Sequence, residues 1–331
     1  MDTEWIYFDA VTGYDKGELN HAAQILRQGG LVAFPTETVY GLGGDGFNPQ
    51  AAKKIYEAKG RPSDNPLILH ISKREELDAI AARIPETAEK LMDAFWPGPM
   101  TLIFEKTKAV PYETTGGLDT VAVRMPSHEG ARQLIESAGV PVAAPSANTS
   151  GRPSPTTAEH VKEDLWGRID MIIDGGLVGI GVESTIIDVT EETPTILRPG
   201  HITKNMIAKV IGTVQMDAGL SGLDQSVKPK APGMKYRHYA PKASMTVIQG
   251  KKPLSAGLKN LRQNIQKKKW GFLLRMKRCP VIHMDKLCQR DRGMNIPLSR
   301  GYTVHYANLT IWGFRLFFLR VLRMMTGARQ L

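Results

Sequence analysis

Short apolar runs alternate with helical patterns along most of the chain, and this alternation limits the fold more than any other feature. Residues 31–34 and 67–71 are apolar runs of strand length, each followed by a turn. Residues 50–59 instead carry Ala51, Ile55 and Ala58 on one helical face. The alternation predicts an α/β domain with a mixed, largely parallel sheet and flanking helices. Further strands are expected at 100–105, 120–124, 140–144, 171–173 and 184–189, and further helices at 18–30, 84–95, 129–138, 157–165 and 202–211.

Composition divides the chain into three parts. Residues 1–215 carry the alternation, and residues 216–242 lack apolar periodicity, as a linker does. A smaller domain is expected over residues 243–331, beginning with an apolar run. The net charge of +10 would normally indicate a nucleic-acid partner, but residues 270–331 alone hold eleven Lys and Arg against two Asp. The rest of the chain is therefore near neutral.

The cysteine spacing and the hydropathy argue against a metal-binding cysteine cluster, a disulfide framework and a membrane span. Cys279 and Cys288 lack metal-ligand spacing and provide no disulfide framework. No run of about 18 uncharged apolar residues is present, so we expect no membrane association. The first 15 residues do not resemble a signal peptide, and we expect a cytoplasmic protein.

Two segments combine hydroxyls or cations with glycine next to a predicted strand or helix. Residues 34–43, Phe-Pro-Thr-Glu-Thr-Val-Tyr-Gly-Leu-Gly, place hydroxyls beside glycines that permit close backbone approach. An ordinary turn is the alternative. Lys59 and Arg61 flank a glycine at a predicted helix end, where two cations suit a polyanion such as a triphosphate. The alternative is a solvated helix C-terminus, which favours cations for electrostatic reasons.

Two later segments have a similar character. Residues 144–154 are dense in Ser, Thr and Asn, which can cradle phosphate oxygens or cap the following helix. They lack a Gly-Lys-Ser/Thr core and are not a Walker P-loop. Residues 181–188, followed by Arg198, offer two hydroxyls and a guanidinium for a carboxylate or phosphate. Sheet packing with an exposed arginine is the alternative.

Taken together in order and spacing, these segments resemble the YrdC/Sua family of threonylcarbamoyl-AMP synthases. The matching motifs are Pro-Thr-Glu-Thr-x-Tyr-Gly-Leu, Lys-x-Arg, Ser-x-Asn-x-Ser-Gly and Glu-Ser-Thr-Ile-Ile-Asp, and the match spans about residues 15–215. Residues 231–241 resemble the linker of the two-domain members. The resemblance implies a YrdC-like twisted mixed sheet with flanking helices, a linker or lid at 216–242 and a smaller Rossmann-like C-terminal domain.

Enzymes of this family combine L-threonine, bicarbonate and ATP, with Mg2+, into L-threonylcarbamoyl-AMP and pyrophosphate. A downstream tRNA threonylcarbamoyltransferase complex then modifies tRNA position 37. By this resemblance Lys59 and Arg61 are the catalytic cations. The implied ATP-binding residues are Lys59, Arg61, Asn65, Thr120, Ser146, Asn148, Ser154, Arg198 and Tyr239. The implied threonine-binding residues are Thr38, His70, Arg124, Ala144 and Ser184, with His238 and Tyr239 as a lid. No side chain is identified as a metal ligand.

The residues alone leave two other functions possible. One is a carbamoyl-transfer enzyme of the hydrogenase-maturation type, although those proteins add zinc-binding cysteine clusters that this sequence lacks. The other is a non-catalytic module that binds double-stranded RNA or tRNA through phosphate contacts. The near-neutral charge of residues 1–269 weakens the second alternative.

The chain departs from the family pattern after residue 269. From Trp270 onward the strand–helix alternation fails, and the segment contains no glutamate. We interpret this as a shifted reading frame following the lysine run at 267–269, with a divergent basic RNA-binding tail as the alternative. The interpretation predicts that residues 270–331 are incomplete as a domain, and poorly packed or disordered.

Overall fold

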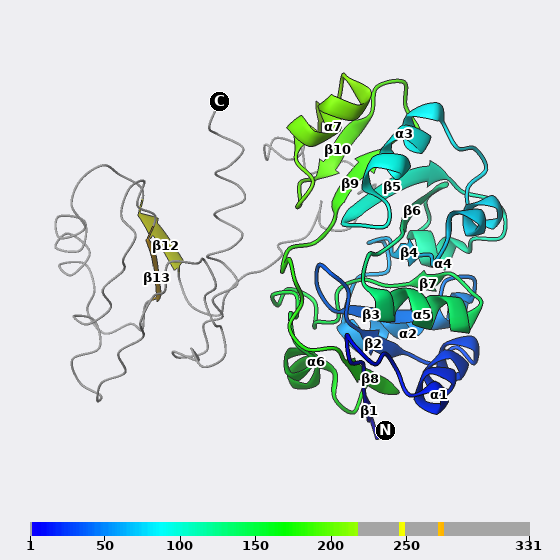
Figure 1. Ribbon diagram of the computed structural model, residues 1–331, viewed down its shortest axis with the longest axis vertical. Coiled ribbons are helices and arrows are strands. Elements are labelled where there is room, and N and C mark those ends of the chain that lie inside the picture. The colour runs from blue at the N-terminus through cyan, green and yellow to red at the C-terminus, as the bar shows by residue number, and fades with distance from the viewer. Residues whose placement is uncertain (1, 218–244, 249–270, 275–331) are drawn as a thin grey trace. The chain divides into compact units, whose positions relative to one another are not determined.

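A computed structural model describes residues 2–217 and two further strands, β12 (Met245–Ile248) and β13 (Gly271–Leu274). They belong to two compact units. The described part of the first unit, residues 2–217, is an α/β fold built on one sheet (Figure 1). In the second unit β12 and β13 pair in parallel. The rest of the linker and of the C-terminal region lies outside the described residues, so the predictions for those parts are not tested.

The sheet of the first unit has eleven strands in the order β1-β8-β2-β3-β7-β4-β6-β5-β9-β10-β11. It is mixed, as predicted, but the prediction of a largely parallel sheet is wrong. Five strand pairs are parallel and five are antiparallel. The strands are β1 (Glu4–Tyr7), β2 (Val32–Phe34), β3 (Gly41–Asp45), β4 (Ile68–His70), β5 (Met100–Glu105), β6 (Thr120–Arg124), β7 (Val142–Ala143), β8 (Met171–Asp174), β9 (Thr185–Asp188), β10 (Thr195–Arg198) and β11 (Gln215–Met216).

One reason why the sheet is not largely parallel is β3, a glycine-rich strand that the sequence pattern did not predict. It pairs antiparallel with β2 and with β7. Glycine normally weakens a strand. Here a Cβ atom on Gly43 would lie 2.8 Å from the Phe34 ring and 2.8 Å from a Val142 methyl. The close approach of neighbouring side chains therefore requires glycine, and the strand forms despite its poor intrinsic propensity.

Helices cover both faces of the sheet, as β2 and the residue before it show. Leu31 and Ala33 join the large core cluster that contains residues of α2, α3, α6 and α7, whereas Val32 and Phe34 pack with α1 and α5. This alternation follows from the two-residue period of a strand. Among the described residues, no helix has the length and apolar character that crossing a membrane requires. The helices are α1 (Lys16–Arg27), α2 (Pro49–Lys59), α3 (Glu86–Phe95), α4 (Tyr112–Thr115), α5 (Glu129–Ala138), α6 (Ala158–Leu165), α7 (Lys204–Ile211) and the 3-10 helix η1 (Arg74–Ala79).

Candidate active site

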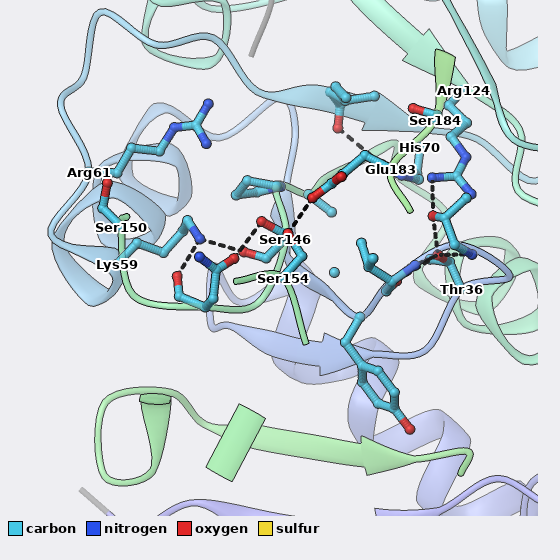
Figure 2. A pocket seen from close by; sticks show the side chains of 18 of the residues that line it. Thr36, Lys59, Arg61, His70, Arg124, Ser146, Ser150, Ser154, Glu183 and Ser184 are labelled. Carbon is cyan, nitrogen blue, oxygen red and sulfur yellow. Dashed lines mark hydrogen bonds between the residues drawn. The ribbon is translucent and has the colours of Figure 1, made fainter. Parts of the chain in front are cut away.

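A cavity that opens to solvent gathers residues from segments far apart in the sequence. It is formed by the loops after β2 and β7, the end of α2, β4 and β6, and the residues around β9 and β10 (Figure 2). The predicted site residues that line it are Thr38, Lys59, Arg61, His70, Arg124, Ala144, Ser146, Asn148, Ser154, Ser184 and Arg198.

Four predicted site residues are not part of this lining. Asn65 is buried in the turn after α2. Thr120 begins β6 and Arg124 ends it, so the two lie about 13 Å apart along the strand. His238 and Tyr239 lie outside the described residues. The roles of these four residues stay predictions.

Lys59 anchors one side of the cavity. It ends α2 and is only 2% exposed, and its ammonium donates to the backbone carbonyl oxygens of Ser146 and Asn148. Burial, and then repulsion from Arg61, lowers the pKa of Lys59 well below its usual value. Lys59 therefore ties the end of α2 to the loop after β7. An anionic ligand next to its ammonium would stabilise the protonated form of the side chain.

The loop that follows β7 is braced by its own side chains. The Asn148 amide donates to the backbone carbonyls of Thr149 and Arg152, both at 2.8 Å. The Asn148 side-chain oxygen accepts from the Ser146 hydroxyl. Buried Asp164, on α6, accepts from the Thr149 amide at 3.1 Å and pairs with Arg152. The loop is thus held in position before any ligand binds, which lowers the ordering cost of binding.

On the other side of the cavity, Arg124 is held by three partners. Its Nη1 donates to Thr38 Oγ1 at 2.9 Å, and its Nε donates to the Gly98 carbonyl at 3.3 Å. Its Nη2 lies 2.6 Å from Glu37 Oε1. Among the described residues neither Nη2 nor the Glu37 oxygens make a well-aligned hydrogen bond. The ion pair therefore orients the guanidinium while leaving it donor capacity for a ligand carboxylate.

His70 is neutral in this environment. Burial, and next the Arg124 charge, lower the pKa of His70 to about 3. Its Nδ1 lies 3.1 Å from the Ile68 carbonyl oxygen, which can only accept, so Nδ1 carries the proton. The Phe34 ring contacts the imidazole edge-to-face. His70 is therefore suited to accept a hydrogen bond through Nε2 and not to act as a cation.

Ser184 is positioned by a close backbone crossing. Its hydroxyl pairs with the Thr101 hydroxyl at 2.7 Å and accepts from Arg198 Nη2 at 3.1 Å. A Cβ atom on Gly200 would lie 2.5 Å from the carbonyl oxygen of Glu183 and 2.6 Å from the amide nitrogen of Thr185. Only glycine allows the two segments to approach this closely.

Two acids were not predicted, one on the cavity lining and one beside it. Glu37 pairs with Arg124, and Glu183 accepts a hydrogen bond from the Ser154 hydroxyl. Each glutamate lies inside one of the motifs identified in the sequence. Its position among hydroxyl-bearing residues was the feature that could have indicated a role in the site. Their partners are distant in the sequence, and no local pattern identifies them.

The fold and the cavity define an α/β protein built to bind a polyanion beside a small molecule that carries a carboxylate. Among the described residues, no group of three or more His, Cys, Asp or Glu could hold a metal ion. The cations Lys59 and Arg61 lie toward one side and Arg124 toward the other, with serine hydroxyls between them (Figure 2). The distribution of charge suits two ligands that lie side by side.

Comparison with known proteins identifies the family. The Sua5/YciO/YrdC family model, described as "Telomere recombination", matches residues 24–200, and the model "Threonylcarbamoyl-AMP synthase, C-terminal domain" matches residues 202–307. The chain belongs to the Sua5/YciO/YrdC family.

Proteins named threonylcarbamoyl-AMP synthase are among the similar sequences. The one from Pyrococcus abyssi is 56% identical over 236 residues, covering 71% of this chain and 69% of that protein. The one from Bacillus subtilis is 55% identical over 234 residues, covering 70% and 67%. The crystal structure of P. abyssi Sua5 complexed with L-threonine superposes with a TM-score of 0.74 at 51% identity, covering 80% of this chain and 76% of that one.

Proposed function

We propose that this protein synthesises L-threonylcarbamoyl-AMP from L-threonine, bicarbonate and ATP and releases pyrophosphate. The product would serve a downstream transferase complex that modifies position 37 of tRNA. One observation carries the proposal: a single cavity is lined both by the cations Lys59 and Arg61 and by the Arg124–Thr38 pair. The names of the relatives from Pyrococcus abyssi and Bacillus subtilis support the same reaction.

The nucleotide would occupy the side of the cavity near the end of α2. Lys59 and Arg61 would neutralise triphosphate charge, and the braced loop would present Ser146, Asn148 and Ser154 to the nucleotide. Arg198, with Asn65, Thr120 and Tyr239, would support it. Mg2+ would enter as MgATP, because phosphate oxygens and water can together supply the ligands that this ion needs.

L-Threonine would occupy the other side. Arg124, already oriented by Glu37, would take the substrate carboxylate, assisted by Thr38 and Ser184. Neutral His70 would accept a hydrogen bond from the substrate, and Ala144 would contact it. A solved relative with L-threonine bound supports an amino-acid site in this fold.

Alignment and charge neutralisation then account for the chemistry. A carbamate oxygen attacks the α-phosphorus, and pyrophosphate leaves with its charge balanced by Lys59 and Arg61. Mg2+ bound to ATP would supply further charge neutralisation. The carbamate loses CO2 easily and the mixed anhydride hydrolyses, so exclusion of water matters. His238 and Tyr239 would provide that exclusion as a lid.

The proposal is tested by measuring pyrophosphate release from the full chain with MgATP. We expect release only when both threonine and bicarbonate are present. Arg61→Gln should abolish most of it, whereas Arg83→Gln, at an exposed position away from the cavity lining, should not. A strict requirement for carbamoyl phosphate would favour the hydrogenase-maturation type of enzyme. Tight RNA binding without turnover would favour the binding module.

A further inference from the structure

Glu183 is the one acidic side chain on a cavity lining that is otherwise cationic and polar, within the part of the chain that the structure describes. The cations on that lining are Lys59, Arg61, Arg124, Arg152 and Arg198. A carboxylate at this position weakens the binding of a triphosphate through repulsion. It therefore calls for a role other than nucleotide binding.

Two features fix the position of Glu183 between the two sides of the cavity. Its carboxylate accepts from the hydroxyl of Ser154, on the proposed nucleotide side. Its backbone precedes Ser184, on the proposed threonine side, and Gly200 crosses closely over it. Figure 2 shows the Glu183 side chain between Ser154 and the Arg124–Ser184 group. Threonine bound through its carboxylate to Arg124 would direct its ammonium toward this region.

The proposed reaction needs a proton acceptor there. Near neutral pH the α-amino group of free threonine is an ammonium, and nitrogen attacks carbon only as the free amine. His70 already uses Nδ1 against the Ile68 carbonyl oxygen, 3.1 Å away. Lys59 already donates to two backbone carbonyls, so it acts as a donor.

We propose that the Glu183 carboxylate takes the proton from the threonine ammonium before carbamate formation, an inference that rests on the proposed function. The N–H bond breaks and an O–H bond forms on Glu183. The free amine then attacks bicarbonate: a C–N bond forms, a C–O bond breaks, and the hydroxyl leaves as water with one of the two amine protons, while the other stays on nitrogen. The product is the N-carboxylate, and Glu183 returns its proton to the solvent to which the cavity opens.

Glu183→Gln tests this role without changing size, because the glutamine oxygen still accepts from Ser154. Synthesis at pH 7 with saturating substrates should fall at least about 100-fold, the usual contribution of a general base. The loss should shrink by about tenfold for each pH unit up to the pKa of the threonine ammonium, as solution supplies the free amine. Glu136→Gln, on the exposed side of α5, is the matched control and should behave as the native chain.

The reverse half-reaction separates proton transfer from nucleotide chemistry. ATP formation from threonylcarbamoyl-AMP and pyrophosphate requires no deprotonation of an ammonium, so Glu183→Gln should retain most of the native rate. An equal loss in both directions at every pH would overturn the inference and assign Glu183 to phosphate or Mg2+ alignment. Full synthesis by the variant at pH 7 would also overturn it. Failure of the native chain to make the product would instead refute the proposed function itself.

Discussion

The Glu37–Arg124 pair offers a quantitative test of how the threonine site is built. The two side chains are 14% and 5% exposed, and their charged atoms are 2.6 Å apart. With an effective dielectric constant of about 20, unit charges at that separation attract by about 6 kcal/mol, part of which the desolvation of both groups offsets. Removing one partner of a buried pair typically costs about 3–5 kcal/mol. Thr38 and Gly98 also hold the guanidinium, so we expect a cost near the lower value for Glu37→Gln.

A double-mutant cycle measures this pair directly. Urea unfolding of Glu37→Gln, Arg124→Gln and the double variant should give a coupling free energy of about 2–3 kcal/mol, because the second substitution removes the charge that the first left unpaired. Glu37→Gln should also raise the KM for threonine, since Arg124 loses its orientation, and leave the KM for ATP nearly unchanged. Glu136→Gln, exposed on α5, is the control.

Additive effects of the two substitutions on the unfolding free energy would contradict this prediction. If the two single effects sum to the double effect within about 0.5 kcal/mol, the charges do not support each other. An unchanged KM for threonine in Glu37→Gln would show that Thr38 and Gly98 alone orient Arg124.

Three further substitutions test the account. The pKa of His70 is about 3 in the folded chain against 6.5 for a free imidazole, so between these values the unfolded chain binds a proton that the folded chain does not. The unfolding free energy should therefore fall by about 1.4 kcal/mol per pH unit as the pH falls below 6.5. His70→Asn should flatten that slope in urea titrations. Gly200→Ala should cost about 2 kcal/mol or more by thermal unfolding, because the methyl group meets backbone at 2.5 Å, whereas Gly179→Ala, with its nearest neighbour at 3.9 Å, should cost far less. Lys59→Met should weaken binding of a non-hydrolysable ATP analogue by roughly tenfold or more in calorimetry and change threonine binding little, because it frees the loop after β7.

The parts of the fold that depend on local pattern were predictable from the sequence. Buried strands such as β5 and β6 are apolar runs of the right length, and α2 begins after Asn48, whose side chain accepts from the amide of Gln50 at 2.9 Å. The end of α2 places Lys59 and Arg61 together because they are neighbours in the chain. Such features need only a few consecutive residues.

Other features depend on which distant segments meet. The strand at Gly41–Asp45 forms by pairing with β2 and β7, and Phe34 and Val142 leave no room for a side chain at Gly43, which propensity alone does not reveal. Its antiparallel pairing is one reason why the sheet is not largely parallel. Likewise, the sequence predicts that Lys59 neutralises triphosphate charge with Arg61, but no local pattern reveals that its ammonium also holds backbone carbonyls of the loop after β7. Pairings between distant segments are set by packing of the whole domain.

The central claim is that one cavity holds a triphosphate and threonine side by side. The most direct measurement is a crystal structure of the full chain with L-threonine and a non-hydrolysable ATP analogue. We predict phosphate oxygens within hydrogen-bonding distance of Arg61 and Ser146, and the threonine carboxylate on Arg124. Phosphates bound at Arg124, or either ligand bound outside this cavity, would contradict the account.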